Sequence, residues 1–170
     1  MKPISKHSCR LLLLLFALAL APTASPVARV APAPLPDFEL KALDGHTVRS
    51  RQLTTRKKWL LIYVEPGCRS CDDVFKVFHR ETPLDELPQK VAVVVGGRTP
   101  EEIKRLTERN DWLPQGCWYA DPTRRAASAL KRRGAPIVYG IKDGQIEWSL
   151  DGLIPDSEKL ESILLTWTEG

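Results

Sequence analysis

The pattern of hydrophobic and polar positions predicts strands in four parts of the chain. Continuous apolar runs at residues 59–64 and 91–95, with Ile or Val in each, indicate two buried parallel strands. Apolar residues at every second position indicate antiparallel hairpins at residues 38–48 and 137–150, each with an Asp-Gly turn dipeptide in its middle. Together these segments predict a mixed β-sheet.

Helical signals lie between the predicted strands. Residues 99–102 (Thr-Pro-Glu-Glu) form a capping box with proline at the first helical position. Asp121-Pro122 predicts a second helix start, and Gly134 is expected to supply its left-handed C-terminal cap after the basic residues 131–133. A final helix carries its apolar residues on one stripe: Leu160, Ile163, Leu164 and Trp167. The alternation of strands and helices predicts a three-layer α/β domain.

The amino-terminal segment has the pattern of an export signal. Lys2, Lys6 and Arg10 precede an apolar run at residues 11–21. Eleven helical residues would span about 16 Å, whereas the hydrocarbon core of a bilayer is ~30 Å thick. The pattern therefore favours a cleaved signal peptide at residues 1–24, or an inner-membrane anchor if cleavage does not occur.

Composition narrows the class of protein that follows this signal. Residues 25–36 are rich in proline and alanine and predict an extended tether, which leaves one domain at residues 37–170. A hydrophobic content of 43% excludes a disordered chain, and 4 cysteines are too few for a disulfide scaffold. The net charge of +4 falls to +1 (4 − 3) without the three basic residues of the signal, so the charge does not indicate a nucleic-acid partner.

The expected chemistry lies in the Cys-Arg-Ser-Cys motif at residues 68–71, between a buried strand and a helix. On the first turn of that helix, free backbone N–H groups and the helix dipole would stabilise a thiolate at Cys68, and Arg69 adds a cation. Cys71 shares the apolar helix face with Phe75, so its sulfur is expected to face the core. We predict that Cys68 is the nucleophile in disulfide exchange and that Cys71 is the resolving thiol.

Other interpretations of the cysteine pair stay open. The pair can be half of a zinc site with Cys117 and His79, although structural zinc usually uses two close-spaced ligand pairs and these two residues are isolated in the sequence. It can also be a purely structural disulfide, although so small a loop gains little stability from chain entropy. The alternative to an enzyme is a non-catalytic binding module, or a protein that holds copper or zinc between the two sulfurs.

Two further features have less specific interpretations. Cys117, at the start of a predicted strand, is expected to be a buried and inert thiol, with an intermolecular disulfide as the alternative. Five basic residues gather within residues 124–133 and predict a solvated helix face.

Taken together, the two hairpins, the strand that leads into the cysteine pair and the segment 134–137 (Gly-Ala-Pro-Ile) resemble thioredoxin-fold proteins of the TlpA-like and ResA-like group. The likeness covers residues 36–167 and includes the strand-helix unit at 117–131 that this group inserts into the plain thioredoxin fold. It implies a thioredoxin-like mixed sheet. It also implies that Pro136 is cis and faces the disulfide, and that Ala135 offers its backbone to a substrate chain.

The chain departs from this group beside the cysteines. Gly67 stands where relatives usually have tryptophan, so Gly67 and Arg69 are expected to make their own contacts with substrate. Ile62 stands where thioredoxin has a buried acid. Glu65 is then the nearest candidate for proton transfer, because Asp72 and its neighbour fit ordinary first-turn helix acids.

The resemblance implies a periplasmic thiol:disulfide oxidoreductase. Its substrates would be protein thiols, and it would act as a reductase, for example in cytochrome c maturation. A membrane thiol carrier would be its electron donor. It would need no metal and no cofactor beyond its own redox-active disulfide. The residues themselves leave the redox direction open, since Arg69 would favour the thiolate and hence the oxidising end of the range.

Overall fold

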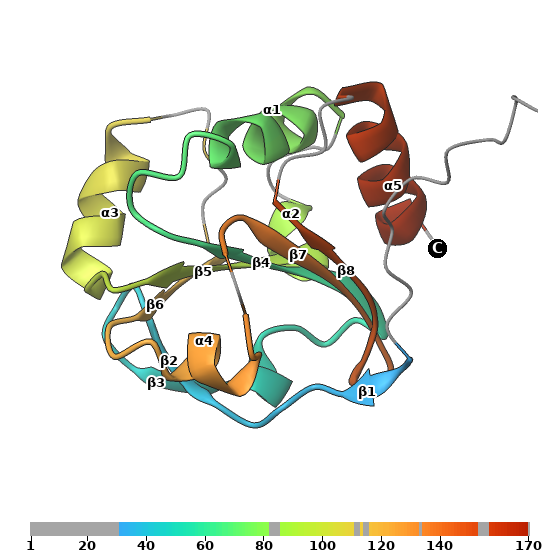
Figure 1. Ribbon diagram of the computed structural model, residues 1–170. Coiled ribbons are helices and arrows are strands. Elements are labelled where there is room, and N and C mark those ends of the chain that lie inside the picture. The colour runs from blue at the N-terminus through green and yellow to red at the C-terminus, as the bar shows by residue number, and fades with distance from the viewer. Residues whose placement is uncertain are drawn as a thin grey trace, which may run out of the picture.

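One mixed sheet of eight strands forms the centre of the computed structural model (Figure 1). The structure describes residues 31–81, 86–110, 113, 116–132, 134–152 and 157–169, so the expected signal peptide lies outside them. The strands are β1 (Ala33–Pro34), β2 (Glu39–Ala42), β3 (Thr47–Arg49), β4 (Lys58–Val64), β5 (Val91–Gly96), β6 (Trp118–Asp121), β7 (Ile137–Lys142) and β8 (Gln145–Asp151). Their order across the sheet is β1-β8-β7-β4-β5-β6-β2-β3.

Strand β4 lies in the interior of the sheet and is paired on both edges. It runs parallel to β5, with Leu60 opposite Val91, and antiparallel to β7, with Tyr63 opposite Ile137. Its residues from Trp59 to Val64 are all buried. The continuous apolar run thus forms the buried strand that the sequence predicts, because both of its faces are covered.

Both Asp-Gly dipeptides form hairpin turns, as predicted. Strands β2 and β3 are antiparallel, and Gly45 between them has φ 89°. Strands β7 and β8 are joined through Asp143 and Gly144, which have φ 49° and 74°. Two successive positive φ angles match the twist of a tight hairpin, and glycine adopts them without steric cost.

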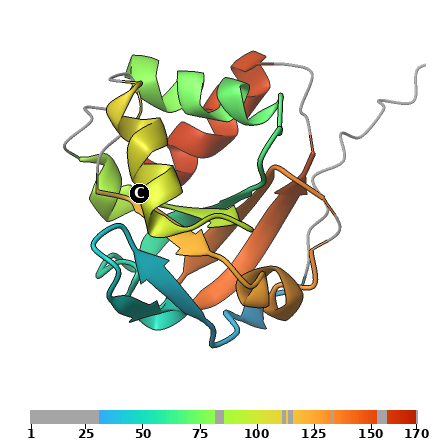
Figure 2. The same ribbon diagram turned by 90° about the vertical axis from the view of Figure 1, so that its left-hand side faces the viewer.

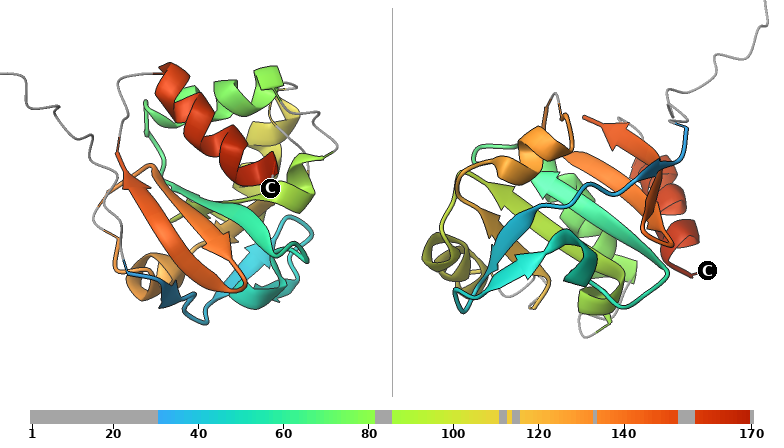
Figure 3. Two further views of the ribbon diagram at one scale, coloured as in Figure 1. Left: turned by 90° about the vertical axis from the view of Figure 1, so that its right-hand side faces the viewer. Right: turned by 90° about the horizontal axis from the view of Figure 1, so that it is seen from below.

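The helices form the outer layers of the domain. They are α1 (Cys71–Glu81), α2 (Leu87–Lys90), α3 (Pro100–Glu108), α4 (Arg125–Ala129) and α5 (Ser157–Glu169), with a 3₁₀ turn, η1, at Ser50–Gln52. Helices α1, α3 and α5 cover one face of the sheet (Figures 1 and 2), and α4 lies on the opposite face (Figure 3, right). The predicted three-layer α/β architecture is confirmed, with one outer layer much thinner than the other.

The capping box of α3 is confirmed. The Thr99 hydroxyl accepts a hydrogen bond from the backbone N–H of Glu102 at 3.3 Å, and the Glu102 carboxylate accepts one from the backbone N–H of Thr99 at 2.9 Å. These bonds satisfy N–H groups that have no partner inside the helix. The sequence pattern thus places the start of α3 correctly.

The predicted bounds of α4 are wrong. Asp121 ends β6, and the helix begins only at Arg125, because the buried Asp121 carboxylate accepts hydrogen bonds from the backbone N–H groups of Arg125 and Ala127 at 2.8 and 3.2 Å. The left-handed residue after the helix is Lys131, with φ 49°, and not Gly134. The Asp121 side chain at the end of β6 therefore caps the N-terminus of this short helix.

Apolar side chains form a core on each face of the sheet. Ile62 and Val64 of β4 belong to the core under α1, α3 and α5, and the intervening Leu61 and Tyr63 belong to the core on the α4 side. The predicted stripe of α5 contributes to the first core: Leu160 and Leu164 are buried, and Ile163 and Trp167 pack against them. Figure 3 (left) shows α5 lying across the sheet.

The sheet begins earlier in the chain than the sequence suggests. Strand β1, inside the segment 25–36 expected to be a tether, pairs with β8, with Ala33 opposite Ile146. Backbone pairing with an edge strand does not depend on the side chains, so composition does not reveal it. No helix within the described ranges has both the length and the apolar character needed to cross a membrane.

Replacement of the buried Leu164 tests the core under α5. Leu164→Ala should lower the free energy of unfolding by about 2–5 kcal/mol, because it removes a fully buried side chain and leaves a cavity. Leu106→Ala is the matched control: Leu106 is 49% exposed, and its loss should cost less than about 0.5 kcal/mol. Urea denaturation measures both values, and equal losses would contradict the assigned packing of α5.

Candidate active site

The loop after β4 carries the cysteine pair. The backbone N–H of Cys68 donates to the Glu65 carbonyl at 3.2 Å, and that of Cys71 donates to the Cys68 carbonyl at 3.3 Å. Gly67 has φ 78°, a conformation that favours glycine. Helix α1 begins at Cys71, so the prediction that Cys68 lies on the first helical turn is wrong: Cys68 lies in the turn that leads into the helix.

Cys68 and Cys71 are joined by a disulfide, and their two sulfurs have different surroundings. Cys71 is 5% exposed and belongs to the core with Val74, Phe75 and Trp118, as the helical spacing predicts. Cys68 is half-buried and lines an open groove. A partner sulfur can therefore approach Cys68 more readily than Cys71.

The segment before β7 reaches the same edge of the sheet as the cysteine loop. Ile137 pairs with Tyr63, one residue before β4 ends, so Ala135 and Pro136 lie beside the point where the chain leaves β4 for the cysteines. The peptide bond between Ala135 and Pro136 is cis. The Pro136 carbonyl accepts a hydrogen bond from the backbone N–H of Gly152 at 2.9 Å. The structure thus places Ala135 and Pro136 beside the loop that carries the disulfide and the other two predicted substrate contacts, Gly67 and Arg69.

Arg132 links the two loops at this edge. Its guanidinium forms an ion pair with the Glu65 carboxylate and donates to the Gly134 carbonyl, and it stacks 4.5 Å from the centre of the Tyr63 ring. Arg124 also reaches Glu65, with Nε 3.3 Å from Oε1. The expectation of a solvated basic face is wrong for Arg132, whose side chain is only 11% exposed because it fills the space between the two loops.

Glu65, the candidate for proton transfer, is therefore held by two guanidinium groups. Its side chain is 30% exposed and also borders the groove beside Cys68. The sequence did not reveal this arrangement, because Arg132 is 67 residues from Glu65 in the chain. The one sign of it in the sequence was that Arg132 stands two positions before Gly134, in the segment expected to lie close to the disulfide.

A buried acid lies on the other face of the sheet. Asp121 is 1% exposed and accepts a hydrogen bond from the Tyr63 hydroxyl at 3.0 Å. Burial and the neighbouring Asp121 carboxylate raise the pKa of Tyr63. Ile62, at the depth where thioredoxin has its acid, is fully buried in the apolar core that contains Cys71. Asp121 therefore lies on the face of the sheet opposite the disulfide, and not at the position of the buried acid of thioredoxin.

Cys117 is a free, buried cysteine with an exposed fraction of 1%. Burial raises the pKa of its thiol to about 12, so the reactive thiolate is scarce near neutral pH. The predicted burial of Cys117 is confirmed, and the raised pKa agrees with the inertness expected of this thiol. In the part of the chain that the structure describes, no group of three His, Cys, Asp or Glu side chains could hold a metal ion.

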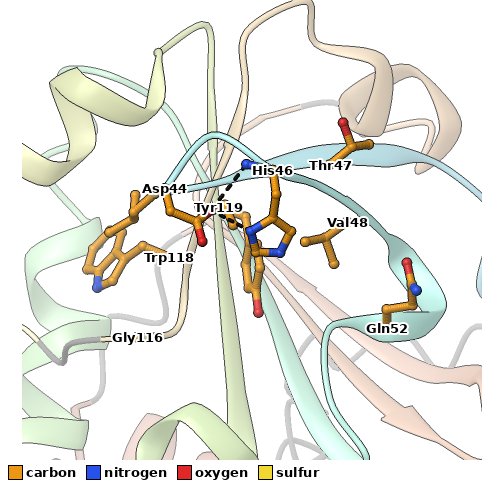
Figure 4. Close-up of a pocket in the computed structure, with 10 residues that line it drawn as sticks. Asp44, His46, Thr47, Val48, Gln52, Gly116, Trp118 and Tyr119 are labelled. Atoms are coloured by element: carbon orange, nitrogen blue, oxygen red, sulfur yellow. Dashed lines mark hydrogen bonds and ion pairs between the residues drawn. The ribbon is translucent and has the colours of Figure 1, made fainter.

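A second hollow lies between the β2–β3 hairpin and β6 (Figure 4). It has a volume of about 480 Å³, and Tyr119 and an ion pair between His46 and Asp44 border it. A backbone hydrogen bond from His46 lowers the pKa of Asp44. No described cysteine lines this hollow, so we assign the candidate active site to the groove beside Cys68.

Solved structures share the architecture of this chain. A thioredoxin-family thiol:disulfide interchange protein from Chlorobium tepidum matches 83% of this chain and 99% of its own length, at 15% identity and a TM-score of 0.58. The chain has the thioredoxin fold. The exposed lipoprotein thioredoxin of Streptococcus pneumoniae matches 76% of this chain and 98% of its own length, at 21% identity and a TM-score of 0.53. A secreted disulfide oxidoreductase of Mycobacterium tuberculosis matches 76% and 95%, at 10% identity and a TM-score of 0.58.

These similar structures agree with the thioredoxin-like fold that the sequence resemblance implies; their names are those of a thioredoxin, a thioredoxin-family thiol:disulfide interchange protein and a disulfide oxidoreductase. Neither a protein-family model nor a curated protein matches the sequence. At these sequence identities the similar structures show the fold of the chain. Its activity has to be argued from its own cysteine site.

Replacement of Arg132 tests the link between the two loops. Arg132→Met should lower the free energy of unfolding of the oxidised protein by about 1–3 kcal/mol, because the carboxylate of Glu65 loses its better-buried partner and the Gly134 carbonyl loses a donor. Arg125→Met is the control, since Arg125 is exposed and should contribute less than about 0.5 kcal/mol. Equal urea midpoints for the two variants would rule out the link.

Proposed function

We propose that the protein is an exported thiol:disulfide oxidoreductase that exchanges disulfides with protein thiols in the periplasm. The observation that carries this proposal is the disulfide after β4, with Cys68 at an open groove and Cys71 in the core. Disulfide exchange needs one thiol that a partner can reach and a second that a partner cannot reach but that lies close to the first. The thioredoxin fold of the chain supports the same activity.

The exchange takes place in two steps, each of which forms one disulfide bond and breaks another. The Cys68 thiolate attacks one sulfur of a substrate disulfide; a mixed disulfide forms, and the other substrate sulfur leaves as a thiolate. The Cys71 thiolate then attacks the Cys68 sulfur, which forms the intramolecular disulfide and releases the substrate as a second thiolate. The substrate gains two electrons, and the Cys68–Cys71 pair loses two.

We propose that the protein works as a reductase, for example on cytochrome c precursors. A membrane thiol carrier would return two electrons to the disulfide after each cycle. The resemblance to TlpA-like and ResA-like proteins supports this direction. The exposed Arg69 opposes it only weakly, because water and salt screen a charge at the surface.

Substrate would contact both loops at the edge of the sheet. We assign Ala135 and Pro136 to one side of the substrate chain, and Gly67 and Arg69 to the other. No atom lies within 4 Å of the point that a Gly67 Cβ would occupy, so this side is open where a tryptophan is usual in the group. Glu65 remains a candidate for proton transfer, through its place at the border of the groove.

Export is supported by the basic and apolar pattern of residues 1–24. Two of the similar structures bear names that point the same way, an exposed lipoprotein and a secreted oxidoreductase. An oxidising compartment also suits a protein whose active-site cysteines form a disulfide.

Equilibration with glutathione buffers tests the proposed activity. A chain with Cys9→Ser should show one two-electron transition of the Cys68–Cys71 pair at about −270 to −120 mV, and a midpoint near the lower end would support a reductase. Thiol trapping followed by mass measurement gives the midpoint. A pair that does not cycle, or one that retains zinc or copper at one equivalent, would exclude the oxidoreductase and favour the binding module.

Trapping of mixed disulfides tests the roles of the two cysteines. Cys71→Ser should accumulate mixed disulfides through Cys68 upon reaction with an oxidised protein substrate, because no thiol remains to resolve them. Cys117→Ser is the control and should accumulate none, because Cys71 still resolves the mixed disulfide and the buried Cys117 takes no part in the exchange. Non-reducing electrophoresis detects the products, and equal trapping by Cys68→Ser would reverse the assignment.

A further inference from the structure

The groove beside the disulfide is bordered by the loop after β4, by the start of helix α1 and by helix α3 (Figure 1). Its volume is about 930 Å³. Buried apolar residues form its base: Val95, Ile103, Leu113 and Trp118. Leu106 of α3 also lines it and, at 49%, is the one large apolar side chain among the described residues that is exposed. The groove therefore offers apolar contact directly beside Cys68.

Arginine side chains dominate the charge along the groove. Arg69, Arg105 and Arg109 line it and are exposed, and none of them forms an ion pair with a carboxylate of the described residues. The Arg105 Nε donates to a backbone carbonyl, that of Glu101, at 3.3 Å. These three cations line the same groove as Cys68: Arg69 from the cysteine loop, Arg105 from α3, and Arg109 from the cap at the end of α3.

The acidic residues of the groove offset little of this charge. Glu102 is bound to Arg98 at 2.8 Å and to the backbone N–H of Thr99, and Glu65 is bound to two other arginines. Asp72 is the remaining described acid in the lining. Backbone hydrogen bonds lower the pKa of Glu101 and Glu102, and the charge of Arg105 also helps to lower it. Arg69 and Arg109 therefore carry most of the positive charge that the described acids leave without an ion pair, although the net charge of the whole chain is only +4.

We infer that the groove selects, as its substrate, a protein segment with acidic residues next to the reactive disulfide and with an apolar residue in reach of Leu106. This inference rests on the proposed function and adds the class of substrate to it. Unpaired arginines would attract carboxylates during the approach and hold them at the rim. Leu106 and the apolar base would accept the apolar side chain of the same segment.

Peptide mixed disulfides test this selection in the reduced chain with Cys9→Ser. Three peptides of equal length carry one cysteine and one leucine, with glutamate, glutamine or lysine at the flanking positions, and each cysteine is joined to 2-thiopyridine. Attack by Cys68 on the peptide sulfur releases the thiopyridine, which is followed by its absorbance, and Cys71 then releases the peptide thiol.

The glutamate peptide should react about tenfold faster than the lysine peptide at ~0.01 M salt, where the screening length is ~30 Å, and less than about twofold faster at ~1 M salt, where it is ~3 Å. The double variant R105Q/R109Q should slow the glutamate peptide about three- to tenfold. The control K104Q/R51Q removes the same charge from exposed residues outside the groove and should change this rate less than about twofold.

Three other results would overturn the inference. Equal rates for all three peptides at low salt would remove the selection for acids and leave the proposed function intact. Oxidised glutathione reacting as fast as the glutamate peptide, with the same dependence on R105Q/R109Q, would show that the groove serves a small anionic disulfide. No release of thiopyridine from any peptide would reject the proposed function, and the inference with it.

Discussion

The burial of strand β4 is the constraint on which the rest of the structure depends. The strand is paired on both edges and covered on both faces, so its residues from Trp59 to Val64 are at most 5% exposed. The chain can become polar again only where it leaves the sheet at Glu65. The cysteine loop follows at once, and a rigid strand therefore fixes the position of the disulfide.

The alternation of side chains along β4 separates two kinds of environment. Ile62 and Val64 face the apolar core that contains Cys71, which keeps one sulfur away from water. Tyr63 faces the opposite side, where Arg132 and the buried Asp121 contact it. Charged groups on that side hold the loops in place, while the apolar side shelters the Cys71 sulfur. A one-residue shift of β4 would exchange these environments.

The position of each charge matters more in this chain than the net charge. Arg124 and Arg132 neutralise Glu65 beneath the site, and Arg98 neutralises Glu102 at the border of the groove. Arginines without such partners then remain around Cys68. A chain with a net charge of +4 can in this way present a strongly positive approach to one sulfur.

The sequence by itself determined the buried strands, the two hairpins with their turns and the cysteine pair, because each depends on residues that are neighbours in the chain. Continuous apolar runs, Asp-Gly turns and the Thr99 capping box act over a few residues, and the helical spacing sufficed to bury Cys71. Only the tertiary structure decided how these elements meet: the cap that the buried Asp121 gives to α4, the ion pair between Glu65 and Arg132, and the groove that Cys68 shares with Arg105 and Arg109. Arg105 and Arg109 lie four residues apart, a spacing visible in the sequence. The face to which their helix turns depends on packing between elements distant in the chain, and no local pattern encodes it.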